Sequence, residues 1–147
     1  MGKTYDFLVK LLKILIVLAI ILSILVFVKN NIEKKQIKQA LTTVGHELQA
    51  THITGYSGNE NNDRGVIKAE MAVKDREEIF TQCKKALPNL GPQFEKLNNY
   101  YDTLAIIADL PDEDFQGLII PIDQIDKIEW DKLNNFDEFL NYVSMMK

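Results

Sequence analysis

Oxygen-bearing side chains recur at short intervals in the segment SGNENNDRGVIKAE, residues 57–70. They stand at Asn59, Asn61, Asp63 and Glu70. This spacing is close to that of an EF-hand calcium loop, which takes oxygen ligands at alternate positions and a glutamate near its end. Such a loop needs glycine at its sixth position, where the chain turns sharply. Here Arg64 stands at that position and Gly65 follows one residue late. The pattern therefore predicts the polar tip of a hairpin and no bound metal.

The other residues that could do chemistry are few and dispersed. The two histidines, His46 and His52, are six residues apart and would lie on opposite sides of one helix. The single cysteine, Cys83, stands among apolar residues at helical spacing, as a buried thiol does; a reactive thiol would need a base close by. The acidic stretches PDEDF and DQID have no histidine, lysine or nucleophile beside them. We expect no catalytic residues, no cofactor and no metal site, and hence not an enzyme.

Charge divides the chain into two parts. Residues 1–38 hold seven lysines and two acidic residues, whereas residues 39–147 hold ten basic and nineteen acidic residues. An acidic domain is repelled by phosphate backbones, so we expect no nucleic-acid partner.

The most pronounced feature is the apolar run FLVKLLKILIVLAIILSILVFVK, which includes an uncharged stretch from Ile14 to Val28. As a helix, residues 7–28 would extend about 33 Å, enough to cross a hydrocarbon core of about 30 Å. One alternative is a cleaved signal peptide, but the residues after Val28 lack the small pair of a cleavage site. Another is a buried soluble helix, which would need protein on every side. We therefore expect an uncleaved single-pass signal-anchor.

The lysines that flank this run give little bias in orientation. Lys3, Lys10 and Lys13 lie on one side, and a second group follows it, namely Lys29, Lys34, Lys35 and Lys38. The count leans slightly toward a cytoplasmic C-terminal domain. A short N-terminal tail before a signal-anchor favours the opposite arrangement, and we expect the domain to be extracytoplasmic.

After the apolar run, helical and strand periodicities alternate. Ile37, Leu41, Val44 and Leu48 continue a helical face, which predicts one helix from about Tyr5 to about Leu48. The later patterns predict strands at 48–56, 65–74, 103–110 and 117–122, and helices at 75–87, 92–97 and 135–143. Short loops within each strand pair favour antiparallel hairpins. The order α-β-β-α-β-β-α predicts an α+β fold with a four-stranded, mainly antiparallel sheet and packed helices.

These elements predict three regions along the chain. Residues 1–29 form the tail and transmembrane anchor, residues 30–48 an amphipathic stalk, and residues 49–147 a small acidic α+β domain. The expected centre of the domain core consists of Leu104, Ile106, Ile107, Leu118, Ile119 and Ile120, with Phe80, Phe94 and Phe139 packing from the helices.

Together these features favour a single-pass membrane protein that is not an enzyme. Its small acidic domain would act as an interaction or accessory module at the membrane surface. The expected partners are membrane lipid, through the anchor, and another protein.

Two other classes share some of these features. A long N-terminal helix, first apolar and then amphipathic, followed by a sheet domain resembles the layout of type IV pilins and pseudopilins, which would imply a structural subunit of a filament. Those families carry a glutamate at the fifth position after a processing site, and counted after Gly2 that position holds Phe7. A small immunity or phage-lysis membrane protein also fits the size.

Overall fold

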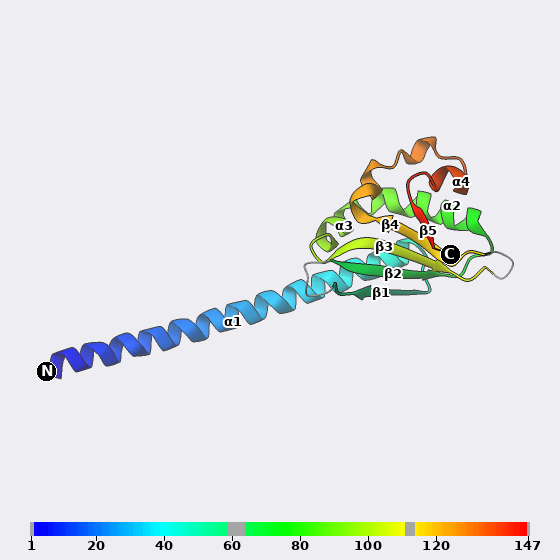
Figure 1. Cartoon of the computed structure of the whole chain (residues 1–147). Coiled ribbons are helices and arrows are strands. Elements are labelled where there is room, and N and C mark those ends of the chain that lie inside the picture. Colours follow the sequence, from blue (N-terminus) through cyan, green and yellow to red (C-terminus); the bar gives the residue numbers. More distant parts are fainter. Residues whose placement is uncertain (1, 59–63, 111–113, 147) are drawn as a thin grey trace. The chain divides into compact units, whose positions relative to one another are not determined.

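The computed structural model of the chain describes residues 2–58, 64–110 and 114–146 (Figure 1). The chain divides into two compact units, Met1–Gln36 and Ile37–Lys147. Helix α1 (Gly2–Glu47) supplies the whole of the described part of the first unit and the beginning of the second. The expectation of one long N-terminal helix is confirmed.

In the first unit, α1 is apolar over most of its surface. Apart from the half-buried Val9, the large apolar side chains from Tyr5 to Val28 are all at least 42% exposed. Within the described part of the chain, α1 is the helix long and apolar enough to span a membrane, by length and composition. Its one polar residue in the uncharged stretch, Ser23, donates its hydroxyl to the carbonyl of Ala19 at 2.8 Å, so this group has a hydrogen-bond partner within the helix.

The second unit is built on a mixed sheet with the order β1-β2-β3-β4-β5. The strands are β1 (His52–Tyr56), β2 (Gly65–Met71), β3 (Tyr101–Ala108), β4 (Gly117–Pro121) and β5 (Ser144–Met146). The α+β class is confirmed, and so are the antiparallel hairpins β1–β2 and β3–β4. The expected four-stranded, mainly antiparallel sheet is wrong in two details, because a fifth strand is present and the central pair β2–β3 is parallel.

The parallel pair follows from the helices that connect β2 to β3. These are α2 (Arg76–Ala86), the 3₁₀ turn η1 (Leu87–Asn89) and α3 (Gly91–Leu97). Asp75 begins α2 by accepting a hydrogen bond from the Glu78 amide at 2.8 Å, as a helix N-cap does. A crossover that contains helices returns the chain to the edge at which β2 began, so β3 runs in the same direction as β2.

The C-terminal segment differs from the single helix expected over residues 135–143. A helix begins where it was expected, with Asn135 as its N-cap, but that helix, α4 (Phe136–Phe139), ends after one turn. The chain then extends and pairs with β4 as β5. Without β5, the edge of β4 would leave backbone groups unpaired, and pairing there outweighs the local helical preference.

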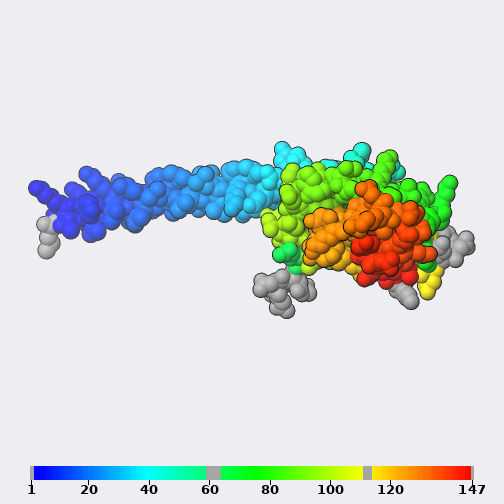
Figure 2. Space-filling model, turned by 90° about the horizontal axis from the view of Figure 1, so that it is seen from above, coloured from blue at the N-terminus to red at the C-terminus, as the bar shows by residue number. Residues whose placement is uncertain are grey.

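The two faces of the sheet have different surroundings. Residues that point to one face are buried, among them Ile67, Ala69, Leu104, Ile106, Leu118 and Ile120, each 0% exposed. The helices lie on this side (Figure 1), and their Phe80, Phe94 and Phe139 are buried as predicted. The last turns of α1 belong to the same layer, since Val44 is buried and Gly45 lies against Ile53 of β1. In Figure 2, which looks onto the helix layer, the C-terminal segment lies beside α2.

The opposite face of the sheet is only half-buried. Val66, Lys68 and Glu70 alternate with the buried residues of β2, and Ile107 and Ile119 occupy the same side of β3 and β4. The prediction that Ile107 and Ile119 lie at the centre of the core is therefore wrong. Their apolar runs are continuous in sequence, but helices cover these strands on one side only.

Candidate functional site

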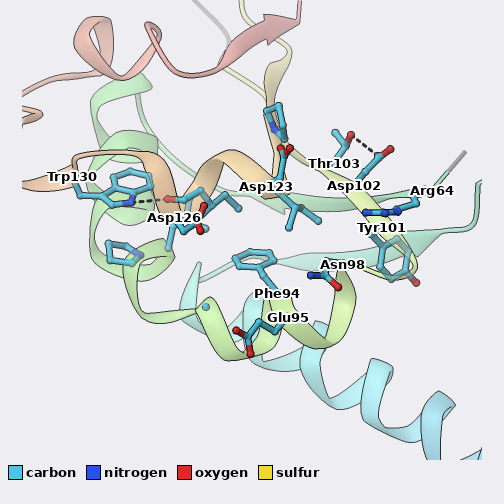
Figure 3. Close-up of a pocket in the computed structure, with 16 residues that line it drawn as sticks. Arg64, Phe94, Glu95, Asn98, Tyr101, Asp102, Thr103, Asp123, Asp126 and Trp130 are labelled. Atoms are coloured by element: carbon cyan, nitrogen blue, oxygen red, sulfur yellow. Dashed lines mark hydrogen bonds between the residues drawn. The ribbon is translucent and has the colours of Figure 1, made fainter.

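The described domain has a cleft of about 880 Å³ at one end of the sheet. It lies between α3 and the 3₁₀ segment η2 (Ile122–Lys127), with the start of β3 and the end of β4 behind it (Figure 3). We call it the acidic cleft. Its volume is in the range of about 300–1,000 Å³ that small-molecule sites occupy, and peptide side chains can enter a space of this size.

Proline and glycine residues set the walls of the acidic cleft. The helical chain after α2 is interrupted at Leu90, with φ −99° and ψ 10°, and α3 then starts with Gly91 and Pro92. On the opposite wall, Pro121 ends β4 with φ −61° and ψ 128° and leads directly into η2. Pro121 is the last residue of β4.

The rim of the cleft carries an excess of negative charge. Figure 3 places Asp123 and Asp126 on the η2 wall and Glu95 on the α3 wall, with Asp102 at the start of β3. All four carboxylates belong to exposed residues. Arg64 is the basic residue that lines the cleft. The ion pairs found among the described residues join other side chains, and the Asp102 carboxylate accepts a hydrogen bond from the Thr103 hydroxyl at 2.8 Å. The negative charge of the rim favours the approach of a cationic group.

The floor of the cleft is aromatic and largely buried. Phe94 and Trp130 are 5% and 8% exposed, and the Trp130 indole donates to the carbonyl of Ile125 at 3.3 Å. The Tyr101 side chain lies against Gly55 and Gly65, where it occupies the space that a Cβ atom on either glycine would need. Burial raises the pKa of the Tyr101 hydroxyl. An apolar floor inside a carboxylate rim can bind a group that is cationic and partly apolar.

Of the residues in the calcium-like pattern, the structure describes only Glu70. Asn59, Asn61 and Asp63 lie outside the described residues. Glu70 lies on the half-buried face of β2, where its carboxylate pairs with the Lys68 ammonium at 2.8 Å. This hydrogen bond and the attraction between the charges lower the pKa of Glu70 and raise that of Lys68. Within residues 2–58, 64–110 and 114–146, no group of three potential His, Cys, Asp or Glu ligands is assembled.

The remaining candidates lie on three different elements. His46 is in the last turn of α1 and His52 begins β1. Cys83 is fully buried in α2, and burial raises the pKa of its thiol to about 12, so it is held as an inert thiol at neutral pH. The expectation that Cys83 is a buried apolar residue is confirmed.

The sequence patterns did not reveal the acidic cleft. DQID was recognised as a carboxylate source, but its neighbours in the cleft come from α3 and β3, distant in the chain. One feature of the sequence could have indicated the cleft. Pro121 follows an apolar strand directly, where it marks the end of that strand, and the aspartates Asp123 and Asp126 come next.

In comparisons with known proteins, no protein-family model, no curated protein and no solved structure matches this chain.

Proposed function

We propose that this chain is a single-pass membrane protein whose small acidic domain binds a partner protein at the membrane surface without catalysing a reaction. The observation that carries the proposal is the uncovered apolar surface of α1 between Tyr5 and Val28. Exposing that much contiguous apolar surface to water is unfavourable, and soluble monomers rarely do so. A bilayer covers it on every side, and the helix satisfies its own backbone hydrogen bonds.

Alkaline carbonate extraction of membranes that contain the full chain tests the anchor. We expect the protein to stay in the membrane pellet. A matched variant, Ile20→Lys with Ile24→Lys, places two charges in the middle of the run, where each is unfavourable by about 2.5–3.5 kcal/mol on insertion scales. This variant should be extracted. Release of the unmodified chain would contradict anchoring.

The acidic cleft supports the binding part of the proposal. Its four exposed carboxylates surround an apolar floor, an arrangement that favours a basic segment of a protein over nucleic acid. His46 and His52 lie on different elements and Cys83 is buried, which supports a role without catalysis.

Site-specific photo-cross-linking in native membranes tests this binding. A photoreactive residue at Asn98, which lines the cleft, should capture a protein that the same residue at Lys132 does not. The capture should weaken in Asp123→Asn with Asp126→Asn, and not in the control Asp109→Asn, which changes an exposed carboxylate outside the cleft. Equal capture at both positions would contradict a partner in the cleft.

We further propose that the domain is extracytoplasmic, as expected for a short N-terminal tail before a signal-anchor. A cysteine introduced at Lys132, whose side chain is 73% exposed, should react with a membrane-impermeant maleimide in intact cells. The native Cys83 is buried and gives no background while the domain is folded. Labelling only after the cells are lysed would place the domain in the cytoplasm.

A further inference from the structure

β1 is an edge strand without the usual protection against pairing with another chain. Edge strands in soluble proteins are commonly shielded by lysine, by proline, by a bulge or by being very short. β1 has the sequence HITGY, which contains neither a charged residue nor a proline. Its five residues pair with β2 without a register shift. The other edge, β5, has only three residues.

The hydrogen bonds around Glu70 show which backbone groups of β1 point outward. The Glu70 carbonyl accepts from the Thr51 amide at 2.8 Å and from the Thr51 hydroxyl at 3.1 Å, so the backbone of Glu70 faces β1. Backbone groups alternate along a strand, and Glu70 is opposite His52. His52, Thr54 and Tyr56 therefore bond to β2. The N–H and C=O groups of Ile53 and Gly55 point away from the sheet.

These outward groups have no backbone partner within the described part of the chain. The hydrogen bonds there join β1 to β2 and to the turn before it, and none crosses the outer edge. In Figure 1, β1 forms the border of the sheet. An added strand would satisfy these groups, which is the mode of recognition known as β-strand addition.

We infer that the strand added at β1 is the β1 of a second copy of this chain, antiparallel and related by a two-fold axis through Thr54. In this register Ile53 of each copy is opposite Gly55 of the other. Since both residues point outward, each of these pairs exchanges two backbone hydrogen bonds. The inference goes beyond the proposed function and involves neither the anchor nor the acidic cleft.

The side chains of β1 are complementary to themselves in this register. Thr54 meets Thr54 of the second copy, and His52 meets Tyr56, which are favourable kinds of cross-strand pair. Ile53 extends beside Gly55, which has no side chain because Tyr101 occupies that space. The strand is neutral, so two copies meet here without like charges, whereas residues 39–147 hold nineteen acidic residues against ten basic ones.

Disulfide formation by the full chain in membranes tests the register. In Thr54→Cys the two introduced thiols belong to a directly opposed pair with Cα atoms about 4.5 Å apart, within the range that a disulfide spans. We expect a cross-linked dimer under mild oxidation. The matched control is His52→Cys on the same strand, whose two copies would be about 13 Å apart at about 3.3 Å per residue. This control should not cross-link with itself, but it should cross-link with Tyr56→Cys.

Three outcomes would overturn the inference. These are equal cross-linking of Thr54→Cys and His52→Cys, no cross-linking of either, and a cross-link from Thr54→Cys to a different protein. The buried Cys83 is present in all variants and contributes equally.

A charge-swap experiment provides a second readout. Thr54→Glu places a carboxylate opposite Lys68 within its own sheet, and Thr54→Lys places an ammonium opposite the ion pair that Lys68 forms with Glu70 at 2.8 Å. Neither variant therefore leaves an unbalanced like charge within the domain, but two copies of either residue repel across the axis. Energy transfer between donor- and acceptor-labelled full chains should fall to background for Thr54→Glu alone and for Thr54→Lys alone. It should return when the two variants are mixed. Undiminished transfer for Thr54→Glu alone, or no recovery in the mixture, would contradict pairing through Thr54.

Discussion

Two neighbouring isoleucines in β3 should respond very differently to truncation. Ile106 is 0% exposed on the helix-covered face, where it lies opposite Ala69 and Leu118 of the adjacent strands. Ile107 is half-buried on the opposite face. The Ile106→Ala and Ile107→Ala variants therefore remove the same atoms from two different environments. Helices cover the side chain of Ile106, whereas that of Ile107 is partly open to solvent.

The expected magnitudes follow from these environments. Ile→Ala removes about three CH₂ equivalents, each worth about 0.8 kcal/mol when fully buried, or about 2.4 kcal/mol in all. At Ile106 the enclosed cavity adds to this loss, and we expect a decrease of about 2–5 kcal/mol in the free energy of unfolding. At Ile107 only part of the side chain is buried and solvent can fill the space, so we expect about 1 kcal/mol.

The protein contains its own reporter for this measurement. Trp130 is the only tryptophan in the sequence and is packed against Phe139, with ring centroids 5.4 Å apart. Its fluorescence in urea titrations of the full chain, held in a mild detergent, reports unfolding of the domain. Equal shifts of the midpoint for Ile106→Ala and Ile107→Ala, at unchanged slope, would refute the assignment of a covered and an uncovered face.

Three further predictions concern the glycines, the cysteine and the polar loop. Gly55→Ala should lower the free energy of unfolding by about 1–3 kcal/mol because the new methyl group meets the Tyr101 ring, whereas the control Gly91→Ala, with open space around it, should not destabilise; urea titration compares them. Burial raises the pKa of the Cys83 thiol from 9.0 to about 12, so above pH 9 only the unfolded state loses this proton. Stability should then fall by up to about 1.4 kcal/mol per pH unit between pH 9 and 12, and Cys83→Ala should lack this component in urea titrations at pH 8 and pH 10. Calcium should not raise the melting temperature, and calorimetric binding tighter than about 1 mM would contradict the interpretation of residues 57–70 as a hairpin tip.

Local patterns in the sequence predicted the features that depend on neighbours in the chain. The 3.6-residue periodicity gave α1, and the alternation of Ile67, Ala69 and Met71 gave β2 with its buried side. The caps at Asp75 and Asn135 were recognisable because a short polar side chain there satisfies a free amide.

Features that depend on distant segments could not be read in this way. The parallel β2–β3 pair and the strand β5 depend on which edges are available after the rest of the sheet has formed. The uncovered side of Ile107 depends on where the helices lie, and a continuous apolar run does not indicate that. The acidic cleft brings together Glu95, Asp102 and Asp123 from three separate elements, and no spacing in the sequence connects them.

The parallel central pair also affects the order in which the domain can form during synthesis. The β1–β2 hairpin is complete as soon as Met71 has been made, but the inner edge of β2 has no partner until α2, α3 and then β3 have followed. Contacts between segments that are distant in the sequence form slowly. Strand edges that stay unpaired during this time promote aggregation. The nascent chain therefore passes through a stage in which both edges of its first hairpin are open, and this stage should be its most vulnerable to misassembly and to capture by chaperones.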